Sequence, residues 1–170
     1  MSDNGSDVVD NIIGCSIDEI QTQIQYLAQT PVAGIARLLW KQQAVLKKGI
    51  IQSLRCLGTL KTEFGEMARS VPQATSGERK FRVAELLDLL NGPDCPDNAL
   101  LSGVKNFISM DARGEVIYNV TLLFRAGEYL IKDGNKRTMA FYSRRRESRE
   151  DRIYFPVYIV EVEGSQRARS

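Results

Sequence analysis

The densest group of residues that could do chemistry is a basic stretch near the end of the chain. Between positions 132 and 152, eight basic residues stand against four acidic ones, a local charge of +4 in a chain whose formal net charge is +2. The basic residues are Lys132, Lys136, Arg137, Arg144, Arg145, Arg146, Arg149 and Arg152, with Tyr142 and Tyr154 as flanking aromatic residues. Because cationic side chains bind phosphates and aromatic rings stack on bases, the stretch predicts a contact surface for RNA or DNA. An anionic membrane surface or an acidic protein is an alternative partner, and a solvated loop is the simplest interpretation.

Inside this stretch, the string Asp133-Gly134-Asn135-Lys136-Arg137-Thr138 resembles the centre of the Fic/Doc family motif, H-x-F-x-D-G-N-K-R. The resemblance covers these six residues and implies a helical enzyme that transfers AMP or phosphate groups. It implies an anion-binding loop shaped by the glycine and asparagine, with Arg137 holding nucleotide phosphates. The chain departs from the family at Tyr129, where the catalytic histidine would stand, and at Ile131, where the phenylalanine would stand. Asp-Gly is equally typical of a two-residue hairpin turn, which explains the string without any chemistry.

The sequence contains no histidine, which excludes Ser-His-Asp and Cys-His hydrolases and leaves an enzyme only lysine, tyrosine or carboxylates for proton transfer. Its three cysteines, Cys15, Cys56 and Cys95, are widely spaced and form no CxxC pair. This pattern favours buried free thiols over a zinc site. We therefore expect a protein that is not an enzyme and holds no metal or cofactor.

The elements that must position these groups begin with helices. Ser16 and Glu19 fit a capping box, and Pro31 ends the helix that follows. A long amphipathic helix is then predicted from about Ala33 to Arg69, because apolar residues recur there at seven-residue spacing. Its seam predicts a homo-oligomer, with Gln43 as a polar register marker, although an intramolecular bundle is the alternative. The interface residues would be Leu39, Gln43, Leu46, Ile50, Leu57, Leu60 and Phe64.

The second half of the chain changes from helical to strand-like periodicity. A third helix is expected over 78–90 and a short one over 99–108, followed by strands at 115–124, 129–132, 137–143 and 153–163. The turn Asp133-Gly134 would join two of these strands, and 143–152 would form a basic hairpin loop. The predicted fold is α+β, with N-terminal helices followed by a small antiparallel sheet of three to four strands.

The predicted organisation is a flexible leader (1–14), a helical oligomerisation region (15–70), an α+β domain (78–164) and a tail (165–170). No apolar run is long enough to cross a bilayer, and the acidic N-terminus is unlike a secretory signal, so we expect a cytoplasmic or nuclear protein. The leading functional hypothesis is a self-associating binding or structural protein, similar in organisation to small viral accessory or matrix factors. A nucleotide-handling enzyme and a protein–protein adaptor are the alternatives.

Overall fold

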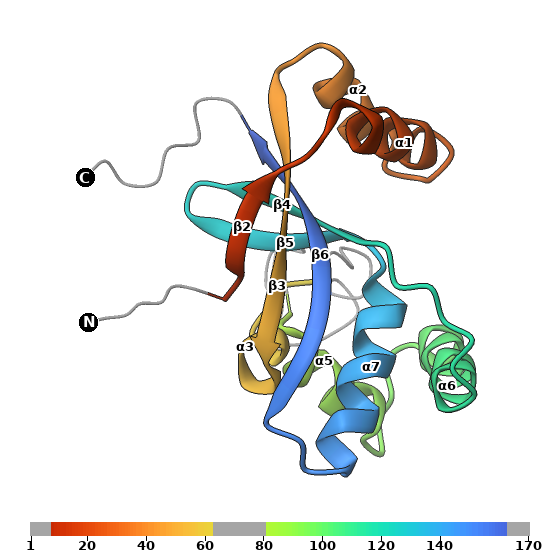
Figure 1. Cartoon of the computed structure of the whole chain (residues 1–170). Coiled ribbons are helices and arrows are strands. Elements are labelled where there is room, and N and C mark those ends of the chain that lie inside the picture. Colours follow the sequence, from red (N-terminus) through yellow and green to blue (C-terminus); the bar gives the residue numbers. More distant parts are fainter. Residues whose placement is uncertain (1–7, 63–80, 163–170) are drawn as a thin grey trace. The chain divides into compact units, whose positions relative to one another are not determined.

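The computed structural model describes residues 8–62 and 81–162 and divides the chain into two compact units. The sheet unit takes in the described residues up to 52, residues 119–133 and the described residues from 154 onward. The helical unit takes in the described residues from 53 to 118 and residues 134–153. Each unit is therefore built from segments that are far apart in the sequence, as the colours of Figure 1 show.

The five-stranded sheet has the order β2-β3-β6-β4-β5 and lies in the sheet unit, except for the last residue of β3 and the first two residues of β6. Its strands are β2 (Asp10–Gly14), β3 (Ala44–Ser53), β4 (Val120–Arg125), β5 (Glu128–Asp133) and β6 (Arg152–Val162). β2 pairs antiparallel with β3, and β4 pairs antiparallel with β5. β4 lies parallel to β6, with Val120 opposite Val157 and Leu123 opposite Val160. The sheet is therefore mixed, and the expectation of a purely antiparallel sheet of three to four strands is wrong.

The hairpin of this sheet lies between β4 and β5. Ala126 and Gly127 connect the paired residues Arg125 and Glu128, and both have positive φ angles, 53° and 78°. Two consecutive left-handed residues are the geometry of a type I′ turn, which matches the twist of the strands that it joins. The hairpin thus forms at Ala126-Gly127, and the prediction that Asp133-Gly134 joins two strands is wrong.

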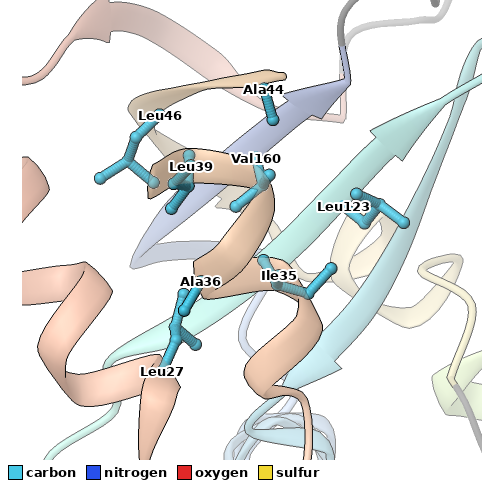
Figure 2. Close-up of a cluster of buried hydrophobic side chains, with 8 residues drawn as sticks. All are labelled: Leu27, Ile35, Ala36, Leu39, Ala44, Leu46, Leu123 and Val160. Atoms are coloured by element: carbon cyan, nitrogen blue, oxygen red, sulfur yellow. The ribbon is translucent and has the colours of Figure 1, made fainter. Parts of the chain in front are cut away.

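Two helices, α1 (Ile17–Ala28) and α2 (Ala33–Trp40), pack on one face of the sheet. Figure 2 shows the side chains that fill the contact, with residues of both helices gathered against residues of β3, β4 and β6. The cluster consists of Leu27, Ile35, Ala36, Leu39, Ala44, Leu46, Leu123 and Val160. A buried polar contact joins the same layers, since Gln23 Nε2 of α1 donates a hydrogen bond to Thr121 Oγ1 of β4 at 3.0 Å. Tyr26 of α1 likewise donates to the Asp133 carboxylate at 2.7 Å.

The helical unit consists, in its described residues, of α3 (Leu54–Gly58), α5 (Val83–Leu90), α6 (Asn98–Ala112) and α7 (Asn135–Glu147). α7 contacts each of the other three helices. Its middle is buried on every side, because the five consecutive residues 138–142 are all buried. α7 is therefore the central helix of this unit, and the residues at its two ends are the ones that reach solvent.

The long helix predicted from Ala33 to Arg69 is wrong. Its residues form α2, then strand β3, then the short helix α3, and residues 63–69 lie outside the described part of the chain. The prediction of a return strand at 137–143 and a basic hairpin loop at 143–152 is also wrong, because α7 occupies Asn135–Glu147. The strand expected at 115–124 begins only at Val120.

Other predicted elements are confirmed. α1 begins at the expected capping box, in which Ser16 Oγ accepts from the Glu19 amide at 3.1 Å and the Glu19 carboxylate accepts from the Ser16 amide at 2.7 Å. β5 and β6 occupy the predicted positions within a residue or so, and α5 covers the described end of the third predicted helix.

The two ends of the chain were expected to be a flexible leader and a tail. Strand β2 occupies the last five residues of the expected leader, and the tail at 165–170 lies outside the described residues.

Candidate functional site

The first candidate site is the N-terminal turn of α7, which holds most of the Fic-like string. Gly134 precedes the helix with φ +96°, a left-handed conformation that glycine adopts without a steric penalty. No side chain caps this end; the Gly134 carbonyl instead accepts from the Thr138 amide at 2.9 Å and from the Thr138 hydroxyl at 2.7 Å. The first amide groups of a helix have no carbonyl partner in the same helix and carry its positive dipole end. This turn therefore favours a negatively charged ligand.

Two basic side chains follow the glycine, and they differ in their contacts. The Arg137 guanidinium donates to the carbonyls of Ile117 and Tyr118, both at 3.1 Å, and so fixes the segment that precedes β4 to the start of α7. Lys136 is exposed and makes no ion pair with any described residue. Its stem crosses α6 at Gly103, where an added Cβ would lie 3.1 Å from Lys136 Cδ. Arg137 is thus a structural residue, whereas Lys136 is the cation that solvent can reach.

The arginines near the end of α7 are largely held by acids of their own unit. The Asp111 carboxylate, whose side chain is 5% exposed, accepts from Arg144 at 2.7 Å, from Arg145 and from the Tyr118 hydroxyl. The Arg145 guanidinium also lies 3.8 Å above the ring of Phe141, and that ring meets Tyr118 edge to face. We call Asp111, Tyr118, Arg144 and Arg145 the Asp111 cluster.

The charges of the Asp111 cluster change the acidities of its members. Burial alone would raise the pKa of Asp111, but hydrogen bonds from Tyr118, Arg144 and Arg145 outweigh it and hold the pKa below its usual value. Burial, together with the bond to the ionised Asp111, raises the pKa of Tyr118. The carboxylate is therefore ionised and the phenol neutral near pH 7, as a structural ion pair requires.

The remaining predicted residues are divided between the two units. Arg146 pairs with Asp88 at 3.0 Å and lies over the ring of Tyr142, which is 8% exposed and therefore has no free face for a base. Arg149 and Arg152, which follow α7, are exposed and make no ion pair with any described residue. Lys132 and the exposed Tyr154 belong to the sheet unit. The structure thus gathers most of the predicted basic residues in the helical unit, where Lys136, Arg149 and Arg152 have no ion pair with a described residue.

The predicted oligomer seam is distributed over several elements. Leu39 and Leu46 are buried in the cluster of Figure 2, while Leu57 and Leu60 are buried in the helical unit. Gln43 is exposed after α2, Ile50 is half-buried on β3, and Phe64 lies outside the described residues. These leucines therefore fill intramolecular cores, and the helical seam that motivated the oligomer does not form. Self-association by another surface stays a prediction.

Sequence reasoning missed two groups of residues. It gave no role to Asp111, which lies near the end of α6. No local pattern marks Asp111 as the partner of Arg144 and Arg145, which follow it by 33 and 34 positions. It also missed a pocket in the sheet unit, whose lining residues come from β2, α1, β3, the start of β4 and β6. No spacing in the sequence connects these segments.

Comparisons of the chain with protein-family models, with curated proteins and with solved structures found no match. Within residues 8–62 and 81–162, no helix combines the length and apolar character that crossing a membrane requires. The same residues contain no group of three or more histidine, cysteine or carboxylate side chains arranged to hold a metal ion. The three cysteines are free thiols, each partly buried.

Proposed function

We propose that this protein is a binding protein that contacts the phosphate groups of a nucleic acid through the helical unit. The observation that carries the proposal is the N-terminal turn of α7, which no side chain caps and which passes from a left-handed glycine to the exposed Lys136. Phosphate oxygens accept hydrogen bonds from helix-terminal amides and are attracted by the positive end of the helix dipole. Phosphate contacts of this kind carry no sequence information, so we expect affinity without strong sequence preference.

The cations most suited to this role are Lys136, Arg149 and Arg152. All three are exposed residues of the helical unit without an ion pair among the described residues, so a phosphate need not displace an acid to reach them. Arg144 and Arg145 would each have to leave the Asp111 carboxylate, which makes them poorer donors to an external ligand. Binding is therefore assigned to the cations that have no ion pair with a described residue, and a structural role to the paired arginines.

The experiment is fluorescence anisotropy with a labelled 20-nucleotide single-stranded RNA and the matching DNA duplex, over a series of salt concentrations. The test variant replaces Lys136, Arg149 and Arg152 by glutamate. Each neutralised phosphate on a single strand contributes about 0.7 to the slope of log K against log salt, so loss of three contacts lowers the slope by about 2. We expect this flattening together with at least a tenfold loss of affinity at low salt.

A matched control replaces three exposed cations of the sheet unit, Arg37, Lys41 and Arg125, by glutamate. Each exchange changes the charge by two, so both triple variants carry a formal net charge of −4 where the native chain carries +2. The control should keep most of the salt slope. Equal losses in the two variants would show that net charge alone governs retention, and an unchanged test variant would leave the adaptor function as the better hypothesis.

A nucleotide-handling enzyme is the second candidate, and one observation favours it. In the Fic/Doc family the motif loop lies between two helices. Here the string is likewise followed by a helix, α7, but the element before it is the strand β5. Incubation with ATP, followed by mass measurement of the protein and chromatography of the nucleotide, tests this function. Covalent AMP transfer or ATP hydrolysis that is lost on Asn135→Ala would establish it, and unchanged ATP and protein mass would exclude it.

A further inference from the structure

The sheet unit contains a pocket of about 580 Å³, within the range of small-molecule sites. Side chains at every second position of a strand share one face, and on β3 Ala44 and Leu46 belong to the cluster beneath α1 and α2. Lys48 and Ile50 continue the same face and line the pocket. The helices therefore cover one part of this face of the sheet, and the pocket begins where they end.

Strand β6, which lies next to β3 in the sheet, extends the lining by the same alternation. Val160 lies in the helix-covered cluster, Tyr158 packs against that cluster and also lines the pocket, and Pro156 and Tyr154 continue along the wall. Tyr154 is 67% exposed, so its ring is accessible at the opening. The walls thus combine aliphatic side chains with two aromatic rings, a surface suited to a planar apolar ligand.

Among the described residues that line the pocket, the charged side chains are Glu19 of α1 and Lys48 of β3, which form an ion pair with each other. The hydrogen bond from Lys48, aided by the Ser16 amide, lowers the pKa of Glu19, and Glu19 raises the pKa of Lys48. Burial and the nearby Glu19 raise the pKa of Tyr158, so its hydroxyl stays neutral. The charges of the lining cancel, and the pocket favours an uncharged ligand over an anion or a cation.

Asn119, just before β4, supplies an unsatisfied polar group at the pocket. Its Oδ1 is buried and accepts no hydrogen bond from any described residue. Buried acceptors are normally paired, and this one lies in the pocket lining without a donor among the described residues, so a ligand with a donor group could pair with it. A rotation of the amide about χ2 presents either its acceptor or its donor to a ligand.

The backbone around the pocket is also held in uncommon conformations. Asn119 has φ +23°, and Asn11 of β2, which also lines the pocket, has φ +55° beside an irregularity in the pairing of β2 with β3. Gly49 of β3 lies so close to the residue before β2 that an added Cβ would be 2.5 Å from Val9 Cγ1. Positive φ angles at non-glycine residues cost energy and gather at ligand sites.

We propose that this pocket binds an uncharged planar heterocycle with an amide-type donor and acceptor edge, as in a nucleoside, through the Asn119 amide and the rings of Tyr154 and Tyr158. Side-chain amides pair with such edges in a bidentate manner, and tyrosine rings stack on their faces. The inference is independent of the phosphate contacts proposed for the helical unit, because every residue in it belongs to the sheet unit. Since the lining carries no net charge, adding a phosphate to the ligand should not improve binding.

The test is ligand-observed NMR followed by calorimetry on the full chain, with adenosine, guanosine, cytidine and uridine as probes and their 5′-monophosphates as comparison. We expect at least one nucleoside to bind and its monophosphate to bind no more tightly. Tyr154→Ala should weaken binding about tenfold, the size expected from loss of one base–aromatic stacking contact. Asn119→Asp, which keeps the shape and removes the donor, should weaken it by a similar factor or more.

Trp40→Ala is the matched control, because Trp40 is an aromatic residue of the same unit that is 74% exposed and lies outside the pocket. It should leave nucleoside binding unchanged, and circular dichroism should show that all three variants fold. Absence of binding by all four nucleosides at millimolar concentration would overturn the proposal. So would affinities that are unaltered in both Tyr154→Ala and Asn119→Asp, or that fall equally in Trp40→Ala.

Discussion

Replacing Asp111 by asparagine should destabilise the helical unit, because the Asp111 carboxylate receives three hydrogen bonds in a nearly dry position. Its side chain is 5% exposed and accepts from Tyr118, Arg144 and Arg145. Removing one partner of a buried ion pair lowers the free energy of unfolding by roughly 3–5 kcal/mol, because the other charge is left uncompensated. The guanidinium groups of Arg144 and Arg145 are partly exposed, with side chains 37% and 23% accessible, so water recovers part of the loss. We therefore expect Asp111→Asn to cost about 2 kcal/mol.

The assay is thermal unfolding followed by circular dichroism at pH 7. For a chain of this length, about 1 kcal/mol corresponds to roughly 2–4 °C, so the variant should melt roughly 4–8 °C below the native protein. Asp88→Asn is the matched control. It breaks the pair with Arg146, but the Asp88 side chain is 67% exposed, and exposed pairs contribute at most about 1 kcal/mol.

The stabilisation that Asp111 provides should depend on pH. The folded pKa of Asp111 lies below its usual value, so its stabilisation is complete above the ordinary carboxyl pKa of about 3.9 and is lost as the pH falls through the lower folded pKa. The gap in melting temperature between native protein and Asp111→Asn should therefore be full at pH 6–7 and shrink below about pH 4. A variant that melts within about 1 °C of the native protein at pH 7, or a gap that persists undiminished at pH 3, would refute the reasoning.

Two further predictions concern the sheet unit, each checked by urea unfolding. Leu27→Ala removes a fully buried side chain from the cluster of Figure 2 and should lower the free energy of unfolding by about 2–5 kcal/mol. The control, Ile17→Ala, lies at a 73% exposed position next to the cap of the same helix and should cost far less. Similar losses in the two variants would argue against the packing of α1 on the sheet. Ser16→Ala removes the cap of α1 and should lower the free energy of unfolding by about 0.5–2 kcal/mol. The control, Ser102→Ala, lies at an exposed position within α6 and should be neutral or slightly stabilising. Unchanged stability in Ser16→Ala would contradict the capping box.

The elements that the sequence predicts correctly are those with local causes. The capping box at Ser16 and Glu19 satisfies the amides of its own helix, so it can be recognised without knowing the rest of the fold. β6 can be predicted from the alternation of apolar and charged residues near its end, where Val160 is buried and Glu161 is half-buried. In both places the interacting residues are neighbours in the chain.

The long helix fails as a prediction because a seven-residue spacing samples only two positions in each heptad. Leu39 and Leu46 satisfy that spacing, yet one lies on a helix and the other on strand β3, and both enter the same core. Val45, Ile50 and Ile51, which lie on either side of Leu46, are β-branched residues that favour a strand, and Gly49 disfavours a helix interior.

The opposite error occurs at α7, where the chain was expected to return as a strand. Asp133-Gly134 correctly marks a break, and Gly134 does adopt a left-handed conformation, but a helix follows. The five residues from Thr138 to Tyr142 are all buried, so no polar face exists to reveal the helical period. Burial on all sides, which tertiary packing alone decides, removes the periodicity on which sequence reasoning depends.

The sequence by itself determined which charges are present: a basic stretch from Lys132 to Arg152, no histidine and three separated cysteines. Only the tertiary structure decided which of those charges are engaged, because ion pairing depends on distance in space. It placed Asp111 against Arg144 and Arg145 and left Lys136 exposed without an ion pair among the described residues. It also brought Glu19, Lys48 and Asn119 to one pocket from separate segments, a proximity that arises from strand pairing and leaves no trace in sequence spacing.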